Sequence, residues 1–218
     1  MNKTLLVVFL CLVLSACARI APLRPPLLSP FGDGTQWIVW EDIEFRVELN
    51  DKSATAIRVP RGFVTDLAST PREIWSIYPP FGKYLSASIL HDYLYWRQSC
   101  RRDEADRIFY QTMRDAGVDQ ATQSRFYAVL EKKGDAAWKQ NGADKSRGLI
   151  RVIPDRFLET QDGLIAPNSV WSEIRETLRQ RGEQEPLQAS DRELQRACGA
   201  LGREIEVKSG FGYLLFGK

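Results

Sequence analysis

The spacing of the apolar residues changes along this chain from the period of a strand to the period of a helix. From Trp37 to Leu49 apolar and polar residues alternate imperfectly, and a second extended run covers Thr55 to Pro60. Such alternation is typical of strands with one buried face, and the polar residues 50–53 between the runs predict a turn. From Leu85 onward the spacing becomes i, i+3, i+4. We therefore expect a β-hairpin or small sheet followed by helices.

Long helices are predicted over Leu85–Arg97, Asp103–Ala116 and Gln120–Lys133. Gly117 is expected to end the second helix and Gly134 the third, because glycine commonly follows the last helical turn. A short helix is expected to begin at Thr70–Glu73, with a Ser/Thr-type cap and a proline at the first helical position, and to stop at Pro79.

These elements predict an α+β fold, in which a small antiparallel β element packs on a core of about three α-helices. The expected divisions are a signal peptide (1–16), a lipidated tether (17–34), a core domain (35–134) and a C-terminal helical extension (135–218). The extension contains no chemical motif. Helical spacing recurs over Val170–Arg181 and Asp191–Leu201, and Gly210–Phe216 is either a strand or an apolar tail.

The N-terminus predicts a lipoprotein. Lys3 precedes an apolar run, Leu5–Leu14, that has signal-peptide length rather than the length of a membrane span. The run leads into Leu-Ser-Ala-Cys, in which Cys17 would be lipidated after cleavage; an uncleaved anchor helix is the alternative. Ala18 in place of an Asp favours the outer membrane, facing the periplasm. The four prolines within Ala21–Pro30 indicate an extended tether.

Charge and cysteine content restrict the environment of the chain. The formal net charge is only +2, so no nucleic-acid-binding surface is predicted. Of the four cysteines, Cys11 would leave with the signal peptide and Cys17 would be lipidated. Cys100 and Cys198 then remain for the folded body in an oxidising compartment. Spacing alone does not decide whether these two form a disulfide.

The candidate catalytic residues lie on the first two long helices. His91 is the single histidine of the chain, which excludes zinc sites that need several histidines. Asp106 shares a helical stripe with Phe109, so its carboxylate should turn inward, where it needs a partner. Two short-linked antiparallel helices would bring His91 and Asp106 together. Asp106 would then fix the imidazole tautomer and leave the other nitrogen as a base, with Tyr95 donating to the same carboxylate.

A candidate metal site lies beside this base. Asp92 is about 100° around the helix from His91, and together with Asp66 it offers two carboxylates. The loop that begins at Asp66 could add backbone carbonyls. Hard oxygen ligands favour calcium over zinc. A base next to a Lewis-acidic cation is an arrangement typical of hydrolases.

Each of these residues also has a structural interpretation. His91 could be a core histidine, and Tyr95 a core aromatic residue. Asp106 could be a first-turn acid favoured by the helix dipole, three residues after a cap at Asp103. Asp66 could close an Asx-turn, and Asp92 could be a solvated acid on the helix surface. The coincidence of all these residues around one helix is what favours a functional site.

The block Val59–Pro71, followed by His91-Asp92-x-x-Tyr95 and Ala105-Asp106, resembles a family of phage and bacterial proteins with a domain of unknown function. That resemblance covers about residues 37–134 and implies no activity.

A more distant resemblance is to the small bacterial and fungal branch of secreted phospholipase A2. It rests on the Thr-Asp-Leu loop at residues 65–67, the His-Asp-x-x-Tyr helix at 91–95 and the Asp-x-x-Phe pattern at 106–109.

The second resemblance implies a phospholipase A2-like helix pair and a role for each matching residue. His91 would be the general base on water, Asp106 would orient it, and Tyr95 would support the Asp106 carboxylate. Asp66, Asp92 and the carbonyl of Leu67 would hold calcium.

The sequence therefore predicts a lipid-anchored cell-envelope hydrolase that cleaves phospholipid acyl esters with calcium. The alternatives are a non-catalytic envelope lipoprotein, such as a phage-exclusion or binding module with an unknown protein partner, and a cell-wall hydrolase. The walls of the groove discriminate between the enzymes, because apolar walls favour lipid and polar walls favour a cell-wall polymer.

Overall fold

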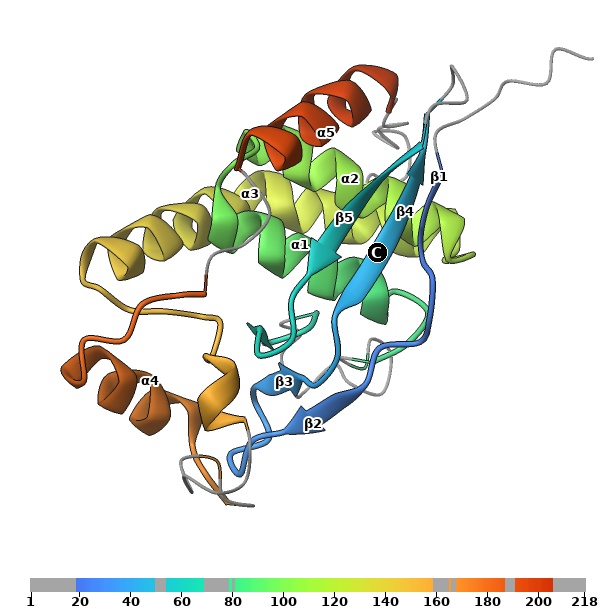
Figure 1. Cartoon of the computed structure of the whole chain (residues 1–218). Coiled ribbons are helices and arrows are strands. Elements are labelled where there is room, and N and C mark those ends of the chain that lie inside the picture. The colour runs from blue at the N-terminus through green and yellow to red at the C-terminus, as the bar shows by residue number, and fades with distance from the viewer. Residues whose placement is uncertain are drawn as a thin grey trace, which may run out of the picture.

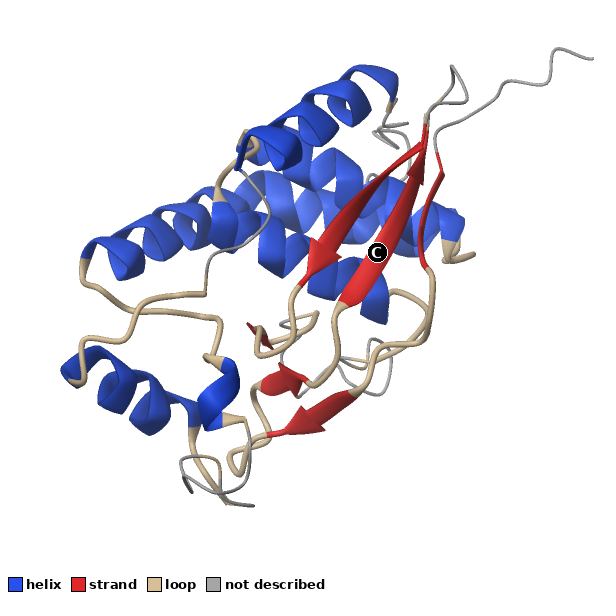
Figure 2. Ribbon diagram, in the orientation of Figure 1, coloured by secondary structure: helices blue, strands red, loops and turns tan. Residues whose placement is uncertain are grey.

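The computed structural model describes residues 19–49, 54–68, 79, 81–158, 165, 168–186 and 191–205. Within these ranges the chain forms two small antiparallel sheets and five α-helices (Figures 1 and 2). The fold is α+β, as predicted.

The larger sheet has the strand order β1-β4-β5, with β1 at Arg19–Pro22, β4 at Ile43–Glu48 and β5 at Ala54–Val59. Burial alternates strictly along β4, so Ile43, Phe45 and Val47 face the core. This pair of strands is the predicted hairpin, and the predicted turn at 50–53 lies outside the described residues. The smaller sheet has the order β2-β3-β6, with β2 at Leu28–Pro30, β3 at Trp37–Val39 and β6 at Val64–Thr65.

The run predicted as one strand over Trp37–Leu49 is divided between the two sheets. It forms β3 and β4, and the chain turns a corner between Val39 and Ile43. At this corner the backbone N–H of Arg61 donates to Asp42 Oδ1 at 2.8 Å. The imperfect alternation in the sequence marks this change of sheet.

Three helices stack behind the larger sheet: α1 at Leu85–Arg97, α2 at Arg102–Asp115 and α3 at Gln120–Ser146 (Figure 1). Helix α5 (Asp191–Glu204) packs on α2, and α4 (Trp171–Gln180) lies beside the smaller sheet. The main hydrophobic cluster lies between the larger sheet and the helices and includes Phe45, Ile57, Leu90 and Leu94. Helix α4, a short 3-10 helix at Asp155–Phe157 and the smaller sheet share a second hydrophobic cluster that includes Phe31, Ile38, Val64, Ile153, Trp171 and Leu178.

Helix α3 does not end at Gly134, so that prediction was wrong. The helix continues to Ser146, and the expected domain boundary at 134/135 falls inside it. Gly134 is buried in mid-helix, where a Cβ would lie 2.5 Å from the hydroxyl oxygen of Tyr95. The glycine is therefore explained by a close approach to a neighbouring helix rather than by a helix end.

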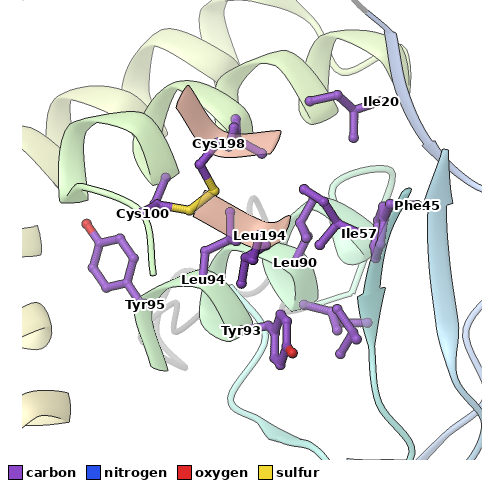
Figure 3. Packing of buried hydrophobic residues seen from close by; sticks show 14 of the residues in the cluster. Ile20, Phe45, Ile57, Leu90, Tyr93, Leu94, Tyr95, Cys100, Leu194 and Cys198 are labelled. Atoms are coloured by element: carbon purple, nitrogen blue, oxygen red, sulfur yellow. A yellow bond between two sulfur atoms is a disulfide. The ribbon is translucent and has the colours of Figure 1, made fainter. Parts of the chain in front are cut away.

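A disulfide joins Cys100, in the loop after α1, to Cys198 of α5, with the Cα atoms 5.6 Å apart. Figure 3 shows Leu194 of α5 beside this disulfide, near Leu94 of α1. The C-terminal extension is thereby fastened to the helices that carry His91 and Asp106.

Part of the predicted tether belongs to the folded body. Strands β1 and β2 both lie within it, and Ile20 is fully buried with its N–H donating to Asp115 Oδ2 at 2.6 Å. The predictions at Cys17, Thr70–Glu73 and Gly210–Phe216 lie outside the described residues. Among the helices that the structure describes, none combines the length and the apolarity that crossing a bilayer needs.

Candidate functional site

The structure brings His91 and Asp106 together. His91 is on the middle turns of α1, and its Nε2 lies 3.0 Å from Asp106 Oδ1 on α2. Both residues are buried, with 7% and 3% of their surface exposed. Asp106 is therefore not a solvated first-turn acid. Its contact with Nε2 favours the tautomer in which Nε2 carries the proton and Nδ1 is an acceptor.

Tyr95 lies one turn after His91 on α1, and its hydroxyl donates to Asp106 Oδ1 at 2.6 Å. Its ring centroid lies 4.1 Å from that of the imidazole, with the two ring planes tilted by 43°. Burial raises the pKa of Tyr95, and the hydrogen bond to Asp106 raises it further. The phenol is therefore a neutral donor at physiological pH.

Arg102 completes the surroundings of Asp106 and was not predicted. Its Nη1 donates to Asp106 Oδ2 at 2.8 Å, across one turn of α2. The i, i+4 spacing was visible in the sequence, but the helix was expected to begin only at Asp103. The carboxylate thus accepts hydrogen bonds from three side chains, and an ion pair compensates its charge.

Helix α3 closes this network. A Cβ at Gly134 would lie 2.5 Å from Tyr95 Oη and 3.0 Å from Arg102 Nη1. The carbonyl of Leu130, one turn earlier, accepts from Arg102 Nη1 at 3.4 Å. Only a residue without a side chain lets α3 approach this closely.

The other predicted acids meet in a second cluster. Asp92 Oδ2 accepts from the hydroxyl of Thr65 at 2.5 Å and from the backbone N–H of Asp66 at 3.2 Å. Leu67 has a φ of 59°, and its N–H donates to Thr65 Oγ1 at 3.0 Å. The loop is therefore folded around the carboxylate of Asp92. Thr65, fully buried, was part of the recognised motif but had not been given a role.

Arg151 is the second residue that the sequence did not reveal. Its Nη2 donates to Asp66 Oδ1 at 2.6 Å, 85 positions away in the sequence. Desolvation in this cluster raises the pKa of Asp92 well above its usual range, and the negative charge of Asp66 acts in the same direction. The guanidinium of Arg151 opposes that rise and is the positive charge among the two acids.

The acid cluster does not fit a calcium ion. Calcium takes six to eight oxygen ligands in proteins, whereas here Asp66 Oδ1 is already ion-paired with Arg151, and Asp92 Oδ2 already accepts two hydrogen bonds. No group of three or more His, Cys, Asp or Glu side chains within the described ranges could hold a metal. We therefore derive no chemistry through a metal here.

Both clusters open into one pocket of about 490 Å³. His91, Asp92, Asp66 and Arg151 lie in its wall. Most of the remaining wall surface is apolar and comes from Leu67, Phe109, Phe126, Val129, Leu130 and Ala137. Arg125, Lys133, Gln140 and Asn141 also line the pocket. In the described part of the chain no group forms a hydrogen bond with His91 Nδ1.

Comparison with known proteins gives a family match and no activity. Residues 37–130 match the model of a family described as "Protein of unknown function (DUF1353)", in agreement with the family resemblance predicted for residues 37–134. An "Uncharacterized protein y4jT" of Sinorhizobium fredii (strain NBRC 101917 / NGR234) is 45% identical over 62 residues. That segment is 28% of this chain, and the chain spans only 18% of that relative. No solved structure matches, so the phospholipase A2 resemblance stays a prediction.

Proposed function

We propose that this protein hydrolyses acyl esters of phospholipids, with His91 as the general base. The observation that carries the proposal is the pairing of a buried His91–Asp106 dyad with a pocket of largely apolar walls. The dyad leaves Nδ1 as the available proton acceptor. The apolar walls suit an acyl chain better than a cell-wall polymer, whose sugars and peptides need polar partners.

In the proposed reaction, Nδ1 of His91 takes a proton from a water molecule. The resulting hydroxide adds to the ester carbonyl carbon and forms a tetrahedral oxyanion. When this intermediate collapses, the bond to the alcohol oxygen breaks, and the proton held by His91 passes to that oxygen. The products are a fatty acid and a lysophospholipid. Asp106 holds the imidazole in one tautomer through Nε2, and Tyr95 and Arg102 hold Asp106.

The test is fatty-acid release from mixed phospholipid vesicles, measured with and without a chelator. His91→Asn keeps a similar volume and a hydrogen-bonding group but cannot act as a base, so we expect a folded protein without release. Asn is chosen rather than a larger or charged residue because the imidazole is buried, with its ring centroid 4.8 Å from that of Phe109. A parent protein that releases no fatty acid from any phospholipid would sink the proposal.

We also propose that Cys17 is lipidated and that the protein is anchored to the cell envelope, on the periplasmic face of the outer membrane. The sequence Leu-Ser-Ala-Cys after an apolar run supports this location. An anchored enzyme would find its substrate in the same membrane. Metabolic labelling with a palmitate analogue tests it, since Cys17→Ser should remove the label, and an equally labelled variant would contradict the assignment.

A non-catalytic binding module is the second candidate, and Arg102 is the observation that favours it. Its ion pair compensates the charge of Asp106, which weakens the electrostatic support that the carboxylate gives to an imidazolium. On this reading the network stabilises the fold and the pocket only binds. His91→Asn would then leave ligand binding unchanged, with no turnover in either protein.

A further inference from the structure

We propose that Arg151 is the resident cation of this site and supplies the positive charge that was predicted to come from calcium. On this proposal the pocket needs no divalent ion, and the guanidinium receives the anionic oxygen of the ligand, a carboxylate or an ester oxyanion. That Arg151 takes the place of calcium rests on its ion pair with Asp66. The role toward an ester oxyanion rests, in addition, on the proposed function.

The backbone of Arg151 is held on both sides. Its N–H donates to Glu185 Oε1 at 2.7 Å, and its carbonyl accepts from the N–H of Val64 at 2.9 Å. The same Glu185 oxygen accepts from the indole N–H of Trp96 on α1 at 2.5 Å. Glu185 thus ties the segment that carries Arg151 to the helix that carries His91.

The side chain of Arg151 is positioned as firmly as its backbone. The guanidinium lies 5.7 Å from the ring centroid of Phe63, within cation–π range, and Nη2 is bound by Asp66. Its side chain is only 13% exposed. A group held in this way needs little reorganisation when a ligand binds, which is what an anion-binding residue requires.

Within the described ranges, most of the donors of Arg151 make no hydrogen bond and can therefore serve a ligand. A guanidinium carries five N–H donors, and among the described residues only Asp66 accepts from this one. Since Arg151 and His91 line the same pocket, a ligand there can meet a base and a fixed positive charge together. A planar guanidinium matches the geometry of a carboxylate and can bind it through two parallel hydrogen bonds.

On this proposal the same ion pair keeps a metal out of the acid cluster. A cation that entered between Asp66 and Asp92 would have to displace Arg151 or lie beside its charge. Removal of the guanidinium would leave the two carboxylates without a counter-ion, and paired hard oxygen ligands are what calcium prefers. The proposal therefore predicts that a calcium site is gained when Arg151 is lost.

The experiment is calorimetric titration of the full chain in detergent, with calcium chloride and, separately, with oleate as the carboxylate probe. The parent should show no calcium binding at the millimolar concentrations that fill weak calcium sites. Arg151→Gln should bind calcium and should bind oleate at least about tenfold more weakly, because the variant loses the charge-assisted hydrogen bond to the carboxylate.

Two further variants keep the test decisive. Arg147→Gln is the matched control, because Arg147 is an exposed arginine that pairs with Asp144 outside the pocket, and it should behave as the parent. Arg151→Lys keeps the charge and should still exclude calcium, even if Arg151→Gln fails to fold. The proposal is overturned if the parent or Arg151→Lys binds calcium. It is overturned equally if Arg151→Gln folds and neither gains calcium nor loses oleate.

Fatty-acid release separates this inference from the proposed function. Release that survives a chelator supports both. A parent that binds oleate through Arg151 and never releases fatty acid ends the enzyme proposal and leaves the assignment of Arg151 intact. Release that requires calcium ends the assignment of Arg151 and leaves the enzyme proposal.

Discussion

Gly134→Ala is the substitution with the sharpest expected outcome, because two effects of opposite sign act at one position. In a helix interior, alanine is more favourable than glycine by about 1 kcal/mol. At Gly134, however, the new methyl carbon would lie 2.5 Å from Tyr95 Oη. The tyrosine hydroxyl must move and lose its 2.6 Å hydrogen bond to Asp106. A hydrogen bond to a charged group contributes about 1.5–3 kcal/mol, so the net effect should be a destabilisation of about 0.5–2 kcal/mol.

Gly142→Ala on the same helix is the matched control. A Cβ there would lie 3.4 Å from the nearest atom, the side-chain oxygen of Gln98, which is ordinary van der Waals contact. We expect this variant to gain about 1 kcal/mol, so the two alanine variants should differ by about 1.5–3 kcal/mol. Urea unfolding measures that difference. In a chain of this size it corresponds to about 2–4 °C in Tm for each kcal/mol.

A second readout comes from the single histidine, since every imidazole signal in an NMR spectrum belongs to His91. The signals should shift in Gly134→Ala, because Tyr95 and His91 share an oxygen of Asp106. They should be unchanged in Gly142→Ala. If both alanines stabilise the protein equally and leave the imidazole unchanged, α3 does not close the network as described.

Three further predictions concern stability. Asp106→Asn removes the charged partner of Arg102 and should lower the free energy of unfolding by about 3 kcal/mol. This is near the lower end of the cost of breaking a buried ion pair, because Arg102 is partly exposed. An unchanged midpoint of urea unfolding would contradict this prediction. Cys198→Ser opens a link between residues 98 positions apart and should cost about 4–5 kcal/mol on the chain-entropy model, which thermal unfolding of the parent with and without reductant checks independently. Burial and the charge of Asp66 raise the folded-state pKa of Asp92. The stability that this carboxyl group contributes is therefore complete below its unfolded pKa of about 3.9 and is lost as pH rises through the folded pKa, so Asp92→Asn should become more stable relative to the parent from about pH 4 upward. A stability difference between the two proteins that does not change with pH would refute the raised pKa.

Local spacing accounts for the part of the site that could be predicted. The i, i+3 and i, i+4 rows place His91 and Tyr95 on one stripe of α1 and turn Asp106 toward the core of α2. A short connection then makes the two helices antiparallel neighbours. No further information is needed to bring these three residues together, since each step depends on nearby positions in the chain.

The residues that were missed depend on longer range or on boundaries. Arg151 reaches Asp66 across 85 positions, and no local pattern marks it. Arg102 was excluded by an error of one residue in the predicted start of α2. Gly134 was interpreted by the usual rule for helix ends, but a hydroxyl from another helix determines that position. Helix starts and glycine roles are decided by packing, which a single sequence does not contain.

The position of strand β1, close to Cys17 in the sequence, would affect how the protein is oriented on a membrane. Strand β1 begins at Arg19, and Asp115 holds the N–H of Ile20. If Cys17 carries the lipid, two peptide steps separate the acylated residue from the sheet, a span of at most about 7 Å. A connection of that length leaves the body little room to swing away from the bilayer. The end of the larger sheet that contains Arg19 would then lie near the headgroups. The lipid would restrict the orientation of the folded body as well as its distance from the bilayer.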